Sequence, residues 1–406
     1  MKGSHGSVRR SPREWIIRGG LSALAAVLGY FSVTFSLAQS VMAGDPALAY
    51  QLAPYEGRIT ARLASSLIDE GADAKIQDRA DRLARAALRT EPTAVVAVST
   101  LGLNAQLRLD TQAARRFFAY AQTLSRRDPK TQLWAIEDAV ARNDIPDALR
   151  QYDITLRTRP QLVSLLYPIL ASASADPAIR GELVRTLGAK PRWSDSFVTY
   201  AARAGTDPAS AAQLFVALQQ ARVALPAGAQ ATVVNRLLNA NRLDEAWRYY
   251  ALIRPKADRA QSRDPGFSTS GENPTMLDWT PINTDGMVAY TQDNAFHFTV
   301  PASVGGPVLQ QMQLLPPRIY RLAGQSVGID DDERARPYWA LRCGAGGREL
   351  GRVVLPNSAE NRGRFSGEFS VPADCPSQAL VLVARPTDKL GGYDAQLRQV
   401  ELVPAR

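Results

Sequence analysis

Histidine and cysteine are scarce in this chain of 406 residues, which contains two of each. The histidines are His5 and His297, so a Ser–His–acid or Cys–His nucleophile system would have to use His297. No Walker loop, G-x-G-x-x-G or H-E-x-x-H pattern occurs in the sequence. We therefore expect no catalytic residue, no cofactor and no metal site, and we predict that the chain is not an enzyme.

Long runs of like charge are also missing, although the formal net charge is +9. Basic tails that bind nucleic acid usually carry blocks of about five or six like charges, so no nucleic-acid partner is expected. The one acidic cluster, at 330–333, is followed at once by Arg334 and Arg336. It lacks the spacing of an EF-hand calcium loop, and we interpret it as a solvated loop.

One long uncharged run does occur, from Leu21 to Ala38, after a tail that carries Lys2, Arg9, Arg10, Arg13 and Arg18. The run is close to the minimum length for a spanning helix, and the positive-inside rule puts the N-terminus in the cytoplasm. We predict a basic cytoplasmic tail at 1–20 and a transmembrane anchor at 21–42. A cleaved signal peptide is the competing interpretation, with the mature chain beginning at Gln39 or Gly44.

A 34-residue period follows the anchor, with small or aromatic residues recurring at the same places in successive helical units. This period is the tetratricopeptide pattern, and the sequence resembles that family over 45–257. The resemblance implies a right-handed solenoid that binds a protein partner. The predicted packing positions between its helices are Ala80, Ala84, Ala87, Gly102, Ala114, Phe118, Ala121, Ala148, Tyr152, Ala246 and Tyr250.

The composition changes at 258–275, which is rich in Gly, Pro and Ser and is predicted to be a linker or the start of a new domain. Beyond it, AFHFTV (295–300) and FSGEFSV (365–371) alternate with a period of two, which indicates an antiparallel β-sandwich over 276–406. The order of these features resembles the jelly-roll type of carbohydrate-binding module.

Candidate glycan contacts in this domain are Trp279, His297 and Tyr338, because such modules stack aromatic rings on sugars. Packing is the alternative role for each ring. Cys343 and Cys375 are predicted to form a disulfide, as an isolated pair in an exported domain usually does. Two free buried thiols are the alternative.

The fold class is therefore multidomain, α followed by β: an N-terminal transmembrane helix, a tetratricopeptide-like helical solenoid and a C-terminal antiparallel jelly-roll sandwich. The combination resembles membrane-anchored tetratricopeptide proteins of bacterial surface-polysaccharide biosynthesis and export. That resemblance implies a single-pass inner-membrane protein with its bulk in the periplasm. It also implies a non-catalytic scaffold with an envelope protein partner and a polysaccharide contact. The alternatives are a general scaffold for peptidoglycan or outer-membrane assembly, and a glycan-active enzyme with unrecognised carboxylates.

Overall fold

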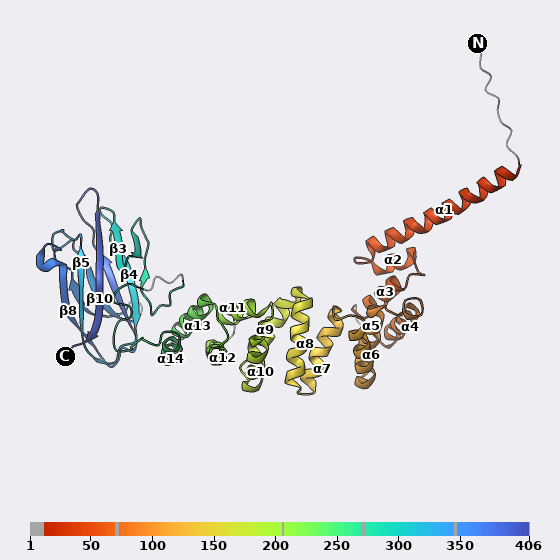
Figure 1. Cartoon of the computed structure of the whole chain (residues 1–406), viewed down its shortest axis with the longest axis horizontal. Helices are drawn as coiled ribbons and strands as arrows, with labels where there is room; N and C mark the ends of the chain where they lie inside the picture. The colour runs from red at the N-terminus through yellow and green to blue at the C-terminus, as the bar shows by residue number, and fades with distance from the viewer. Residues whose placement is uncertain (1–11, 70–72, 205–206, 269–272, 345–346, 406) are drawn as a thin grey trace, which may run out of the picture. The chain divides into compact units, whose positions relative to one another are not determined.

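The computed structural model describes residues 12–69, 73–204, 207–268, 273–344 and 347–405. Residues 1–11 of the predicted cytoplasmic tail, His5 among them, lie outside this description. Helices occupy the first part of the chain and strands the last part (Figure 1). The chain divides into two compact units, Met1–Val163 and Ser164–Arg406. The α-then-β fold class predicted from the sequence is confirmed.

Helix α1 (Pro12–Val41) contains the uncharged run and is long and apolar enough to cross a membrane. It begins before the predicted anchor, with a proline in its first turn. Proline is tolerated there because amides in the first turn have no hydrogen-bond partner within the helix. The short helix α2 (Pro46–Leu52) packs against the end of α1, where Ala38 is buried with Ala49, Ala53 and Ile59. The end of α1 is thus part of a small folded core.

The helices that follow pack mainly as neighbours in sequence, and in Unit 1 α3 pairs with α4, α5 with α6 and α7 with α8. Aspartates stand at many of their starts, and Asp110, for example, accepts a hydrogen bond from the Ala113 amide as the N-cap of α6. The helices are α3 (Gly57–Asp69), α4 (Ala74–Thr90), α5 (Val95–Leu107), α6 (Thr111–Leu124), α7 (Pro129–Ala141), α8 (Ile145–Thr158), α9 (Val163–Ala173), α10 (Pro177–Gly188), α11 (Ser194–Ala204), α12 (Pro208–Gln220), α13 (Ala227–Asn239) and α14 (Leu243–Ile253).

Small residues let these helices approach closely. A Cβ atom at Gly102 in α5 would lie 2.8 Å from the ring of Phe118 in α6. That ring stacks in turn on Trp134 of α7, with centroids 4.3 Å apart. Gly102 therefore leaves space between α5 and α6 for the Phe118 ring, which also packs against α7 of the next helical hairpin. All the packing positions named from the sequence are buried.

Two antiparallel sheets form the β-sandwich, in the strand orders β1-β4-β9-β6-β7 and β2-β3-β10-β5-β8. Their inward faces enclose a core that includes Phe296, Phe298, Tyr320, Trp339 and Phe369. The strands are β1 (Thr280–Pro281), β2 (Val288–Gln292), β3 (Ala295–Val300), β4 (Gly306–Gln313), β5 (Arg318–Val327), β6 (Tyr338–Cys343), β7 (Glu349–Val354), β8 (Arg364–Val371), β9 (Gln378–Ala384) and β10 (Tyr393–Pro404).

The predicted disulfide is present between Cys343, at the end of β6, and Cys375, in the loop before β9. Part of the segment 258–275, predicted as a linker or the start of a new domain, packs with the strands. Ser262 exchanges two hydrogen bonds with Leu402 of β10, and the Phe267 ring belongs to the sandwich core. Residues 262–267 are therefore part of the sandwich, because they bury an aromatic ring and pair with a strand.

Candidate functional site

The three aromatic residues proposed as glycan contacts do not come together. Trp279 lies in the core, where it packs on Phe267 and Trp339 and donates its indole hydrogen bond to the Asp264 carbonyl. Only 7% of its surface is exposed. The ring of Trp279 therefore presents no face to a ligand, and its role is packing.

The other two residues lie on the outward faces of different sheets. His297 of β3 stacks on Tyr290 of β2, with ring centroids 5.1 Å apart and nearly parallel planes. Tyr338 of β6 lies beneath the guanidinium groups of Arg352 and Arg385, at 4.0 and 4.7 Å from its centroid. Cations thus cover Tyr338, whereas Tyr290 remains 44% exposed.

The acidic cluster at 330–333 is only partly solvated, which corrects the interpretation of a wholly solvated loop. Asp331 is buried and accepts a hydrogen bond from the Thr387 hydroxyl at 2.8 Å. The Lys389 ammonium pairs with both Asp330 and Asp331. No group of three or more His, Cys, Asp and Glu suited to a metal ion occurs among the described residues.

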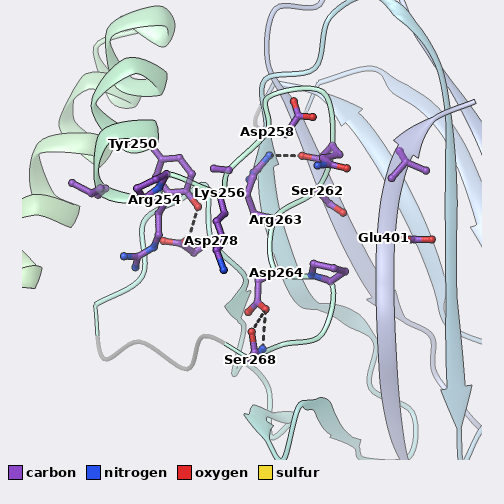
Figure 2. A pocket seen from close by; sticks show the side chains of 16 residues that line it. Tyr250, Arg254, Lys256, Asp258, Ser262, Arg263, Asp264, Ser268, Asp278 and Glu401 are labelled. Carbon is purple, nitrogen blue, oxygen red and sulfur yellow. Dashed lines mark hydrogen bonds between the residues drawn. The ribbon is translucent and has the colours of Figure 1, made fainter.

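A cavity of about 610 Å³ lies in the second unit, between the end of α14 and strand β10. We call it the junction cavity. Figure 2 shows Tyr250 and Arg254 on the helical side, Glu401 on the strand side, and Lys256 and Arg263 between them. A volume of this size is within the range of about 300–1,000 Å³ that is typical of small-ligand sites.

Hydrogen bonds hold the wall of the junction cavity that faces the helices. The buried Tyr250 donates its hydroxyl proton to Asp278 at 2.7 Å. The other carboxylate oxygen of Asp278 accepts from the amide and hydroxyl of Thr275. Burial raises the pKa of the Tyr250 phenol far above its ordinary value, so this hydroxyl stays protonated and remains a donor.

A buried cation forms the floor. Arg263 donates to the carbonyl oxygen of Leu277 through Nε and Nη2, at 3.0 and 2.9 Å, and to the Gln313 side chain at 2.6 Å. Burial lowers the pKa of Arg263 to about 10, because the charged form loses its hydration. Neutral acceptors bind this guanidinium, so its positive charge contributes to the potential inside the cavity.

Three charged side chains on the rim are not engaged. Among the residues that the structure describes, Arg254, Lys256 and Glu401 make no side-chain hydrogen bond or ion pair, and all three are exposed. Ile253, Pro255 and Val403 add apolar atoms to the lining. The junction cavity therefore offers unused donors and an unused acceptor beside apolar surface.

Comparison with known proteins adds a likeness in fold. No protein-family model matches the chain, and no curated protein matches it. A solved structure described as "CBM4 structure and function" is similar over 36% of this chain and 99% of that chain, with 11% identity and a TM-score of 0.27.

Two streptococcal structures are similar at the same level. The Glycosylation Associate Protein (Gap123) complex from Streptococcus agalactiae matches over 30% of this chain and 40% of that chain, with 12% identity and a TM-score of 0.22. Accessory secretory protein 1, 2 and 3 in Streptococcus pneumoniae matches over 30% and 88%, with 13% identity and a TM-score of 0.22. Likenesses this weak identify no ligand or partner for this chain.

One serine motif lies at the end of strand β5. Residues 324–328 read GQSVG and match the G-x-S-x-G pattern of a nucleophile elbow, which belongs at a turn from a strand into a helix. Here Ser326 is buried in the antiparallel strand β5, and its hydroxyl donates to the Gly363 carbonyl. A Cβ atom at Gly324 would lie 2.5 Å from the Phe365 ring, so this glycine serves sheet packing. The motif is not a nucleophile elbow in this fold.

Of the residues that line the junction cavity, the sequence analysis named only Tyr250, which it predicted to be a packing position between helices. The other lining residues come from the end of a helix, from the segment predicted as a linker or the start of a new domain, and from the last strand. A signal was present in that segment, since Asp258, Arg259, Arg263 and Asp264 give it more charge than a Gly/Ser linker normally has.

Proposed function

We propose that this chain is a non-catalytic envelope scaffold, anchored in the bacterial inner membrane by α1, that supports surface-polysaccharide biosynthesis or export. Its helical repeats hold an envelope protein, and the junction cavity binds glycan. The observation that carries the proposal is the set of unused donors and acceptors in this cavity, beside apolar surface.

The lining suits a neutral polyhydroxylated ligand. Arg254, Lys256 and Arg263 supply positive charge, and four carboxylates, those of Asp258, Asp264, Asp278 and Glu401, nearly balance it. Sugar hydroxyls donate and accept together, so they can use both kinds of group, whereas a strongly charged ligand would meet repulsion from one kind. Proline and aliphatic surface supports the apolar faces of a sugar ring. The lining thus favours a sugar over a phosphate or a polyamine.

Existing hydrogen bonds favour binding over hydrolysis. A glycosidase needs one carboxylic acid that gives its proton to the leaving oxygen and a second carboxylate beside the bond. Asp278 accepts three hydrogen bonds, and Asp264 accepts two from Ser268. These hydrogen bonds commit both carboxylates to the framework of the site.

Packing of α1 supports a retained anchor over a cleaved signal. Ala38 is fully buried against Ala49, Ala53 and Ile59. Cleavage before Gln39 or Gly44 would remove Ala38 and expose the other three apolar residues. The anchor hypothesis keeps this core intact.

The proposed glycan site is tested with the full chain in detergent and oligosaccharides prepared from the host's surface polysaccharide. The double variant Lys256→Ala/Glu401→Gln should bind at least about a hundredfold more weakly, because each lost hydrogen bond to a charged group contributes about 1.5–3 kcal/mol and about 1.4 kcal/mol is a factor of ten. The matched control Lys190→Ala/Glu368→Gln changes the same residue types at exposed positions outside the cavity and should bind as the parent does.

Affinities are measured by isothermal titration calorimetry, and the oligosaccharide is assayed afterwards for new reducing ends. Three outcomes would contradict parts of the proposal. Unchanged affinity in the double variant would exclude the junction cavity as the glycan site. Loss of binding in Tyr290→Ala instead would locate the site on the outward face of β2 and β3. Release of new reducing ends from the oligosaccharide by the purified chain would show an enzyme.

A further inference from the structure

Helix α4 carries a row of basic side chains that the scaffold role does not explain. The row consists of Lys75, Arg79, Arg82, Arg85 and Arg89, and we call it the α4 stripe. Steps of three or four residues put all five on one face of the helix, and all five are exposed. Ala80, Ala84 and Ala87 occupy the opposite, buried face.

The charges of the α4 stripe are unpaired within the part of the chain that the structure describes. In the described part of the sequence, none of the five side chains makes a hydrogen bond or an ion pair. The one acid on the same face, Asp78, pairs with Arg108 of α5 at 2.9 Å. Five unpaired cations at this spacing repel each other, so the face is suited to an anionic partner.

The fold brings one end of this helix close to the anchor. The Tyr55 ring packs against Phe31, with centroids 5.8 Å apart, and Phe31 lies within the uncharged run of α1. The chain between Pro46 and Tyr55 carries no charge. Residues 46–55 therefore fold back along the apolar helix as far as Phe31.

Two further contacts link the end of this segment to the α4 stripe. A Cβ atom at Gly57 would lie 2.6 Å from the Thr90 hydroxyl, and Arg58 pairs with Glu91 at 3.0 Å. The start of α3 thus packs against the C-terminal end of α4, next to Arg89. Figure 1 shows α2, α3 and α4 together at the end of α1.

We propose that the α4 stripe binds anionic phospholipid headgroups on the membrane surface that α1 enters. The inference rests on the membrane anchor of the proposed function. Arginine binds phosphate oxygens through two parallel hydrogen bonds, and each basic residue near an anionic surface adds to membrane affinity. Lipid is favoured over an anionic polysaccharide because the contacts of Tyr55 and Gly57 hold the stripe beside the anchor.

The test measures arginine modification by p-hydroxyphenylglyoxal on the full chain in lipid nanodiscs. Discs of phosphatidylcholine are compared with discs that contain about 30% phosphatidylglycerol, a charge density that attracts basic segments. Arg79, Arg82, Arg85 and Arg89 should react about threefold more slowly in the anionic discs, and high salt should restore their rates. Arg116, Arg126 and Arg127, which are exposed on other elements, are internal controls that should not change.

Variants give a second readout, the acetylation rate of Lys75. In the parent chain, Lys75 should be acetylated more slowly in anionic discs than in phosphatidylcholine discs. This difference in rate should disappear in the variant Arg79→Gln/Arg82→Gln/Arg85→Gln/Arg89→Gln. It should persist in the control Arg116→Gln/Arg126→Gln/Arg127→Gln/Arg203→Gln, which removes the same charge from other exposed sites.

The outcomes separate this inference from the anchor on which it rests. A chain that elutes apart from the discs would overturn the anchor and the stripe together. A chain that stays in the discs with equal arginine rates in both lipids would overturn the stripe alone. Protection that requires added anionic polysaccharide, with no effect of phosphatidylglycerol, would overturn lipid as the partner.

Discussion

At the scale of single residues, two glycines in helices should respond in opposite ways to the same change. In Gly102→Ala the new methyl group meets the Phe118 ring at 2.8 Å, and that ring is held against Trp134. Overpacking of this kind costs about 1–3 kcal/mol, more than alanine's gain in helix propensity of about 1 kcal/mol. We expect α5 and α6 to lose stability.

Gly181→Ala in α10 is the matched control, because nothing lies within 4 Å of the added Cβ atom. The variant should gain about 1 kcal/mol from helix propensity alone. Native-state hydrogen exchange of the amides in each helix measures both changes locally. A stabilising effect at Gly102 would show that the Phe118 ring moves freely, contrary to its stacked position.

At the scale of elements, the Cys343–Cys375 disulfide ties the end of β6 to the loop before β9 across 32 positions. Cross-linking a loop of this length stabilises a domain by about 3–4 kcal/mol in the chain-entropy model. The double variant Cys343→Ser/Cys375→Ser should therefore lower the melting temperature of the sandwich, whereas the helices should melt as before. Unchanged melting of the sandwich, followed by near-ultraviolet circular dichroism, would contradict this expectation.

The periodicity of apolar residues predicted helices and strands, because that pattern lies within a single continuous segment of sequence. Ala114 and Phe118 share a helix face, and AFHFTV alternates along one strand, so local sequence was enough for both. The junction cavity was beyond this method because Tyr250 and Glu401 are neighbours only in the folded chain. Trp279 was ambiguous for a related reason: only the core packing of Phe267 and Trp339 decides that its ring is buried.

At the scale of the whole molecule, the proposed topology predicts where a reporter is active. A reporter enzyme that works only outside the cytoplasm, fused after residue 60, should be active and should fractionate with the inner membrane. Cytoplasmic activity would refute the orientation. A soluble mature form that begins at Gln39 or Gly44 would replace the anchor by a cleaved signal.

The proposed scaffold role predicts a particular deletion phenotype. Removing the gene should reduce surface polysaccharide while lipid-linked precursors still form, because a scaffold holds the machinery and does not transfer sugar. Polymer amount and precursor levels, measured in the same strain, test both halves. Unchanged polymer would refute the polysaccharide role, and a defect in peptidoglycan instead would favour the general scaffold.

The pairing of Ser262 with Leu402 also sets an order of events during synthesis. These residues exchange hydrogen bonds of 2.9 and 2.8 Å across 140 positions of sequence. The cavity wall at Ser262 is synthesised early and its counterpart at Glu401 and Val403 is synthesised late, so the cavity cannot form before β10 has been made. If the chain is exported and binds glycan as we propose, a chain stalled before β10 would present its helices to a partner without a complete cavity for a sugar, so only fully exported molecules would bind glycan.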